Sequence, residues 1–406
     1  MSFFKKGELK LLWPFYFDAL FLSMLFLYPI FYILYFREIG FSLAQIGFLG
    51  SAYGLAMFLF EIPTGAIADI WGRKISTILG WFLAGIAMAA VMFTTNFYAI
   101  LVLFFIRGAV LTLSSGARDA WMVDLLKYKK RKKLIHEFYS KWQSFCSIST
   151  LAAGIVGAFL VKIFGLWIIW PLTGSVMILT AFVYSFGQEH FVKSKQKLNG
   201  ITKKAKEIFS HSIKSVHYSV RHPVISLLLA AGMLYWFILI FAGEIVWYPF
   251  LQNLGFKEYW FGYLVSASSV LGIFIPYFTK TLSIKFGGYK KYIIFFLALQ
   301  SLLLFSVFFA KWMFLAIALY IIFVIIDSFY GPVKLVFFQH FLPSKMRATI
   351  DSFRSMLYSL AGIIAAPLAG FIADNIGPQI TIAIGGLLLI PAILLYLKIK
   401  GDVVPK

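Results

Sequence analysis

Apolar residues dominate the chain and recur in long runs between Trp13 and Leu397. A run of about 20 apolar residues crosses the hydrocarbon core of a bilayer as a helix, so each run predicts one span. A spanning β-barrel would alternate apolar and polar residues, and these runs do not. The predicted fold class is an all-α polytopic membrane protein. Twelve spans are predicted, at 12–36, 43–67, 75–95, 98–126, 142–162, 166–187, 223–251, 259–283, 290–310, 313–341, 348–373 and 379–398.

The positive charges fall mainly on one side of this span map. The net charge is +21, yet the connections on one side hold only four basic residues, Arg37, Lys162, Lys257 and Lys311. Lys and Arg accumulate on the cytoplasmic side of membrane proteins, so both termini are predicted to be cytoplasmic, in a plasma (inner) membrane. The basic connections therefore favour anionic lipid as a partner over nucleic acid.

The sequence shows no familiar spacing of catalytic or metal-binding residues. The single Cys146 excludes an internal disulfide, and the six histidines lie in or beside predicted cytoplasmic connections. The sequence contains neither an HExxH zinc motif nor a GxxxxGK nucleotide-binding loop. No enzymatic activity, metal, cofactor or ATP-driven step is expected.

Two segments recur at nearly constant spacing. Residues 40–52 resemble 255–267 at an offset of 215, and residues 143–155 resemble 351–363 at an offset of 208. These matches pair helix two with helix eight and helix five with helix eleven, which indicates a duplicated six-helix unit. An even number of helices gives both copies the same orientation, with a substrate path between them near the bilayer midplane.

The predicted domains are an N-terminal bundle at 1–187, a basic cytoplasmic linker at 188–222 and a C-terminal bundle at 223–406. Residues 201–220 are weakly amphipathic, so this part of the linker either lies on the membrane surface or is a solvated connection.

A charged motif, GAIADIWGRK, occupies residues 65–74 between the second and third spans. It resembles the cytoplasmic signature of the major facilitator superfamily through Gly65, Asp69, Gly72, Arg73 and Lys74. The resemblance implies two pseudo-symmetric six-helix bundles, transport by alternating access and a monomer. On this interpretation Gly65 allows close helix approach, Gly72 a tight turn, and Asp69 caps a facing helix.

In the superfamily the Arg of this motif usually pairs with an acid at the cytoplasmic end of helix four, where this chain has Asp124. The resemblance therefore implies a latch that is closed in one state and open in the other, and the alternative is a tight charged turn without a gating role. The second half lacks an acidic copy of the motif. Helix five has Gly154 and Gly157 but not the Gly-Pro signature common in exporters of the superfamily.

Ionisable residues inside predicted spans are the candidates for coupling and substrate binding, because a charge in hydrocarbon is costly unless it is paired, neutralised or facing water. A carboxyl group that leaves water also holds its proton more tightly, which allows a proton gradient to drive transport. In the superfamily that the chain resembles, helices one, four, seven and ten line the cavity. The candidates are Asp327, Asp119, Glu244, Asp18, Arg107 and Glu61.

Several of these candidates have a structural alternative. Asp327 is the first choice for proton coupling, and otherwise forms a fixed pair with Lys334 two turns away. Asp18 and Glu61 either line the cavity or are structural partners of Arg118, and for Glu61 the structural role is favoured. Arg107 neutralises an acid or binds an anionic substrate.

Aromatic residues make up 19% of the chain, and several lie on the presumed cavity helices: Trp121, Tyr235, Trp236, Trp247 and Tyr330. Such a pocket with isolated acids would suit an amphipathic or cationic compound, although rings in membrane proteins also face lipid or neighbouring helices. The expected function is proton-coupled transport of a small organic molecule, with efflux favoured. The alternatives are a uniporter or importer of a sugar, amino acid or organic anion, and a non-transporting receptor or scaffold.

Overall fold

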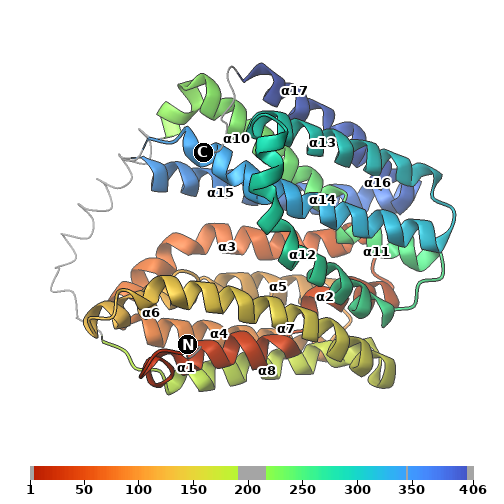
Figure 1. The fold of residues 1–406 in the computed structure, drawn as a ribbon. Helices are drawn as coiled ribbons and strands as arrows, with labels where there is room; N and C mark the ends of the chain where they lie inside the picture. Colours follow the sequence, from red (N-terminus) through yellow and green to blue (C-terminus); the bar gives the residue numbers. More distant parts are fainter. Residues whose placement is uncertain (1–3, 191–215, 344–345, 400–406) are drawn as a thin grey trace. The chain divides into compact units, whose positions relative to one another are not determined.

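The computed structural model describes residues 4–190, 216–343 and 346–399, apart from the side chains at 66, 69, 271–273, 276, 277 and 348. Within these ranges all regular secondary structure is helical, as the apolar runs predicted. Most of the predicted linker 188–222 lies outside the described residues. The α-helices, labelled in Figure 1, are α1 Glu8–Phe17, α2 Tyr28–Glu38, α3 Leu43–Trp71, α4 Arg73–Ala90, α5 Phe97–Leu111, α6 Ala117–Tyr128, α7 Leu134–Phe164, α8 Ile169–Ser185, α10 Pro223–Phe241, α11 Glu244–Asn253, α12 Trp260–Lys285, α13 Tyr289–Ser306, α14 Met313–His340, α15 Arg347–Ile376, α16 Pro378–Leu388 and α17 Ile390–Lys398.

Ten helical segments of the described chain are long and apolar enough to cross a membrane. Each of the ten coincides with a predicted span. The two remaining predicted spans are 98–126, which is divided between α5 and α6, and 259–283, which coincides with α12. The chain is therefore a multi-pass membrane protein.

Three predicted spans are interrupted by two or more residues, and in a fourth, 379–398, Leu389 alone separates α16 from α17. In the first, a π-helical segment at Asp18–Leu22 and a 3-10 turn at Ser23–Leu25 separate α1 from α2. Residues 112–116 separate α5 from α6, and residues 242–243 separate α10 from α11. Hydropathy does not detect the first and third of these breaks, because the residues on both sides are apolar, whereas α6 is much more polar than α5.

The sequence repeat reappears as a repeated turn. Gly40 and Gly255, which are equivalent at the offset of 215, both have φ of +90°, a conformation that favours glycine. Each glycine N–H closes a short turn, and the following Phe N–H donates to a carbonyl five residues back, at 2.9 Å for Phe41 and 3.0 Å for Phe256. This is the Schellman ending of a helix, formed identically in both copies.

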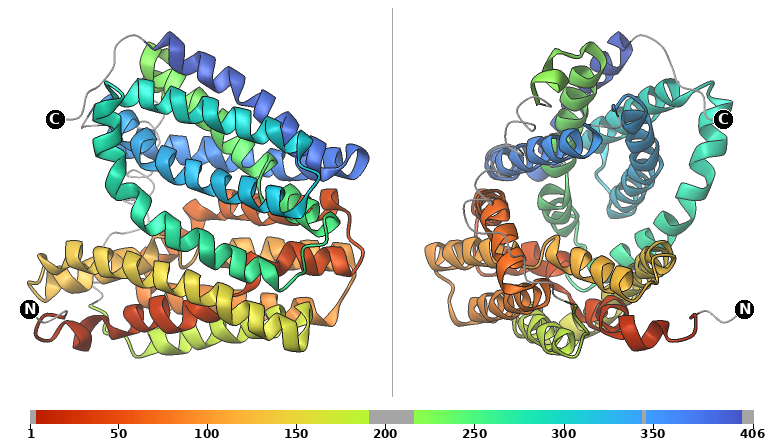
Figure 2. Two further views of the ribbon diagram at one scale, coloured as in Figure 1. Left: turned by 45° about the vertical axis from the view of Figure 1, so that its right-hand side comes forward. Right: turned by 90° about the vertical axis from the view of Figure 1, so that its left-hand side faces the viewer.

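The contacts divide the chain into two compact units. The first comprises residues 1–41, 52–194 and 257–269, and the second comprises 42–51, 195–256 and 270–406. In the first unit, α4 packs along α5 and α8; in the second, α10 packs on α15, and α13 lies between α14 and α16 (Figures 1 and 2). The first turns of α3 belong to the second unit and the rest of α3 to the first. The first turns of α12 belong to the first unit and the rest of α12 to the second.

Large apolar side chains are found on the outside as well as in the core. The first unit buries an aromatic cluster that includes Phe15, Trp121 and Tyr184. By contrast, Ile62 and Phe93 are 84% and 81% exposed, although both lie on apolar spans. In water such surfaces would drive association, whereas in a bilayer they contact lipid tails.

Candidate functional site

The break in the first span places Asp18 inside the first unit. A π-helical turn leaves backbone carbonyls without their usual helical donors, and side chains satisfy them here. Ser149 of α7 donates to the carbonyls of Ala19 and Leu20, the latter at 2.8 Å, and Ser23 donates to the carbonyl of Asp18 at 2.9 Å. The distortion that orients Asp18 is thus held by a neighbouring helix.

The Asp18 side chain is enclosed by polar groups of α8. The residue is only 4% exposed, and its carboxylate accepts hydrogen bonds from Tyr184 Oη at 2.7 Å and from Thr180 Oγ1 at 3.3 Å. Arg118 is near enough to interact with it electrostatically. The geometry around Asp18 is consistent with both alternatives for this residue.

The break in the fourth predicted span places Arg118 and Asp119 at the start of α6. Gly116, with φ of +63°, forms the turn directly before them. Arg118 Nε lies 3.4 Å from Asp119 Oδ1, and the guanidinium carbon lies 4.6 Å from the centre of the Trp142 ring. The Asp119 side chain is 49% exposed, so Asp119 is far more accessible than Asp18.

Arg107 on α5 is a buried cation between two aromatic rings. It is 6% exposed, and its guanidinium carbon lies 4.5 Å from the centre of the Tyr28 ring and 4.6 Å from that of Tyr53. Arg107 forms no ion pair with any acid of the described residues, and its buried Nε has no hydrogen-bond partner. Among the described residues the predicted neutralisation of an acid is therefore absent, and the two aromatic rings offset part of the charge.

Asp327 of α14 lies half-buried in the second unit beside α10. Its Oδ1 accepts a short hydrogen bond from Tyr235 Oη, and the same hydroxyl lies 3.3 Å from Gln300 Oε1 of α13. No basic side chain of the described residues is within ion-pair distance of Asp327. The carboxyl group accepts its hydrogen bond from a neutral partner, and Lys334 is near enough to interact with it electrostatically.

Lys334, one of the bases in the predicted spans, is surrounded by tyrosines. Its Nζ lies 4.6 Å from the centre of the Tyr235 ring, 5.1 Å from that of Tyr330 and 5.6 Å from that of Tyr358. The fixed Asp327–Lys334 pair that was one alternative is thus not formed in this structure, and Tyr235 contacts both groups instead. Trp236, also named from the sequence, stacks on Tyr358. Trp121 and Trp247, the remaining aromatic residues named from the sequence, are fully buried.

Glu244 and Glu61 are both exposed. Glu244 is the first residue of α11, directly after the break at Gly243, where the N-terminus of the helix favours a negative charge. A Cβ at Gly243 would lie 2.5 Å from the carbonyl oxygen of Leu239, so the turn requires glycine. Glu61 lies on α3 and forms no ion pair with a base of the described residues, Arg118 included.

The motif at 65–74 ends α3 and starts α4. Gly72, with φ of +101°, separates the helices, and Arg73 forms an ion pair with Asp124 of α6. The backbone N–H of Lys74 donates to Glu189 Oε1 at 2.9 Å, so a second acid binds the start of α4.

Of two other positions of this motif, Gly65 differs from the expectation and Asp69 is not tested. No described atom lies within 4 Å of a Cβ built at Gly65, so the close helix approach expected there is not present. The side chain of Asp69 lies outside the described residues, and its capping role stays a prediction.

Sequence reasoning missed the neutral partners of the ionisable residues. Thr180, Tyr184, Gln300 and Tyr358 resemble the many other polar and aromatic residues of the spans, and only the fold brings them to Asp18 or to Asp327 and Lys334. Glu189 was assigned to the linker, although it contacts α4. The described residues contain no cluster of three or more His, Cys, Asp or Glu that could hold a metal ion.

Comparison with known proteins agrees with this architecture. The uncharacterised MFS-type transporter YxaM of Bacillus subtilis (strain 168) is 24% identical over 385 residues, which cover 92% of this chain and 91% of that protein. The solved nucleoside transporter NupG aligns with a TM-score of 0.74 and 15% identity over 95% of this chain and 98% of its own. A D-xylose-proton symporter aligns with a TM-score of 0.65 and 16% identity over 96% and 95%.

At these identities the solved structures establish the fold alone. The sequence profile of the Major Facilitator Superfamily, however, matches residues 15–366, which is most of the chain. The motif at 65–74, the repeated helix endings and the ionisable residues at helix breaks lie within this range. The chain belongs to the major facilitator superfamily and is a membrane transporter of that type.

Proposed function

We propose that the protein is a proton-coupled secondary transporter of a small organic molecule, working by alternating access, with export favoured. The observation that carries this proposal is the environment of Asp327. A half-buried carboxyl group bound to the Tyr235 hydroxyl, with no base in contact, can change protonation as the water around it changes. The proposal is also supported by the similar fold of a D-xylose-proton symporter, a protein whose name includes proton coupling.

The breaks in the membrane helices support substrate binding beside the acids that follow them. In secondary transporters, discontinuous helices expose helix ends that bind ions and polar groups of the substrate. Here Asp119 and Glu244 stand at the beginnings of α6 and α11, immediately after such breaks. With the tyrosines around Lys334, these acids favour an amphipathic or cationic compound, for which export is the direction we propose.

A second candidate function is uptake of an organic anion, and Arg107 favours it. An unpaired buried guanidinium between two tyrosine rings is a ready partner for a carboxylate or phosphate group. The fifth predicted span, 142–162, which lies in α7, also lacks the Gly-Pro signature of exporters. The similar solved structures include a nucleoside transporter, so nucleosides belong in any substrate panel.

The experiment is proton release from the purified protein in detergent on addition of tetraphenylphosphonium, ethidium, nucleosides, pentoses or dicarboxylates. The proposal expects one compound class to release protons from the native chain, and expects binding without release from Asp327→Asn. Binding without release in both proteins would replace proton coupling by facilitated transport. Release by dicarboxylates alone, lost in Arg107→Gln, would select the anion alternative.

A further inference from the structure

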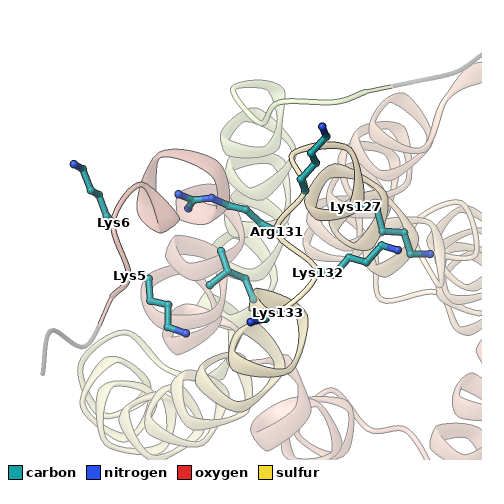
Figure 3. A pocket seen from close by; sticks show the side chains of 8 residues that line it. Lys5, Lys6, Lys127, Arg131, Lys132 and Lys133 are labelled. Atoms are coloured by element: carbon teal, nitrogen blue, oxygen red, sulfur yellow. The ribbon is translucent and has the colours of Figure 1, made fainter.

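A strongly basic pocket lies in the first unit, apart from the ionisable residues of the spans. Its volume is about 830 Å³, and it is formed by the segment before α1 and the turn between α6 and α7 (Figure 3). Leu134, the first residue of α7, also lines it. The basic residues of its lining are Lys5, Lys6, Lys127, Lys130, Arg131, Lys132 and Lys133.

The charge of this pocket is largely uncompensated. Lys5 pairs with Glu137, whereas the other six cations form no ion pair with any described residue. Glu8 is close in sequence but buried, and its Oε1 accepts from Tyr16 Oη and Lys141 Nζ, both at 2.6 Å. Like charges held together repel one another, so this arrangement costs energy unless an anion occupies it.

The backbone of the turn concentrates the charges. Arg131 N donates to the Leu126 carbonyl at 2.8 Å and Lys130 N to the Lys127 carbonyl at 3.1 Å, the two bonds of a Schellman ending. Lys130, which donates the second of these bonds, has the left-handed conformation of such an ending, with φ of +56°. Glycine is the residue that this conformation favours. Lys130 is the only non-glycine residue of the described chain with positive φ.

A close approach brings the segment before α1 to this turn. The Arg131 guanidinium reaches toward α1 in Figure 3, and its nitrogens lie 3.5 and 3.6 Å from where a Cβ of Gly7 would be. Gly7 itself has φ of +73°. The half-buried Arg131 thus joins Lys5 and Lys6 to the cations after α6.

We propose that this pocket binds the phosphate groups of a multiply charged anion. Charge asymmetry alone would require only that the lysines lie on the cytoplasmic side, not that they converge on one cavity through a strained turn. The phosphates can come from the headgroup of an anionic phospholipid or from a soluble polyphosphate, because the predicted cytoplasmic position is accessible to both. The pocket shares no lining residue with the proposed transport site.

The test measures binding to the full-length protein in nanodiscs. Soluble tripolyphosphate is titrated into phosphatidylcholine discs, and cardiolipin occupancy is read by native mass spectrometry after reconstitution with mixed lipids. The test variant is Lys127→Gln with Lys132→Gln and Lys133→Gln. The matched control removes three exposed lysines of the other unit, by Lys280→Gln, Lys285→Gln and Lys398→Gln. Tm values of both triple variants equal to that of the native chain establish that both are folded.

The expected result is a roughly 100-fold loss of affinity in the test variant for at least one probe, and little loss in the control. Loss for tripolyphosphate alone assigns a soluble ligand, and loss for cardiolipin alone assigns a lipid headgroup. Asn tolerates the left-handed conformation of this turn. Lys130→Asn is therefore expected to lower the affinity for the bound probe about fivefold. Equal losses in the test and control variants, or no saturable binding of either probe to the native chain, would overturn the proposal.

Discussion

At the residue scale, the Tyr235 hydroxyl is the contact that most distinguishes Asp327 from the other acids. Asp18 is enclosed by two hydroxyl groups, and Asp119 lies beside Arg118, whereas Asp327 has one neutral donor and partial access to water. We therefore propose the coupling role for Asp327 rather than for the other acids.

Replacing Tyr235 by Phe should impair coupling without unfolding the protein. The substitution removes a hydrogen bond to a group that carries charge for part of the cycle, which is worth about 1.5–3 kcal/mol. We expect substrate-linked proton release to fall by roughly tenfold or more. The control is Tyr292→Phe, which removes another buried hydroxyl of the same unit, one that donates to the Phe329 carbonyl at 3.2 Å. Equal proton release from both variants would remove Tyr235 from the coupling site.

Arg107 separates the two candidate functions. If the substrate is an organic anion, Arg107→Lys should keep part of its affinity and Arg107→Gln should lose about tenfold or more, because a charge-assisted bond to the substrate disappears. If the substrate is cationic, Arg107→Gln should bind it at least as tightly as the native chain. Equilibrium binding of a dicarboxylate and of tetraphenylphosphonium to the same three proteins decides between these results.

The candidate residues could be predicted only in part. Asp18, Asp119 and Asp327 stand out from the sequence because an acid inside an apolar run is expensive. Their partners on other helices, such as Tyr184 and Tyr235, became known only from the fold. Tyr235 was named from the sequence as an aromatic residue, not as the hydrogen-bond donor of Asp327.

At the element scale, the broken spans are the feature that hydropathy could not predict. A window average over residues 223–251 is high on both sides of Gly243, so it indicates one helix where the structure has α10 and α11. The break depends on a single glycine and on the fit of the Leu239 carbonyl against it. The repeated endings at Gly40 and Gly255, by contrast, follow directly from the sequence repeat.

A methyl group at position 243 should destabilise the protein. The Cβ of Gly243→Ala would lie 2.5 Å from the Leu239 carbonyl oxygen, which forces α10 and α11 to shift. We expect a loss of about 1–3 kcal/mol, measured as a lower Tm in detergent. At Gly50, in the first third of α3, a Cβ meets no described atom within 4 Å, so Gly50→Ala should leave Tm unchanged or raise it. Equal Tm values for Gly243→Ala and the native protein would contradict the close contact.

The ion pair between α4 and α6 should matter for transport more than for folding. The Arg73 and Asp124 side chains are 30% and 46% exposed, and such pairs contribute about 0.2–1 kcal/mol to stability. We expect Arg73→Gln and Asp124→Asn each to lower the transport rate severalfold with little change in Tm. The double variant should be no worse than either single one, since both remove the same contact. Additive losses would mean that the two residues act separately.

At the scale of the whole molecule, the fold followed from the sequence more completely than the division into units. Ten of the predicted spans coincide with helices suited to cross a membrane, because span length and apolar character are local properties. Membership of a unit depends on contacts between distant segments. The contacts place the first turns of α3 and α12 in the other unit from the rest of each helix, and the predicted domain bounds 1–187, 188–222 and 223–406 stay a prediction.

The central claim, proton-coupled transport through Asp327, is tested most directly in proteoliposomes with an imposed pH gradient. The substrate is the compound that releases protons from the native protein, and the variant is Asp327→Asn, with Glu258→Gln in an exposed connection as the control. The account predicts that the native chain and the control accumulate substrate against its gradient, whereas Asp327→Asn only exchanges it at equilibrium. Gradient-driven accumulation by Asp327→Asn at the native rate would contradict it.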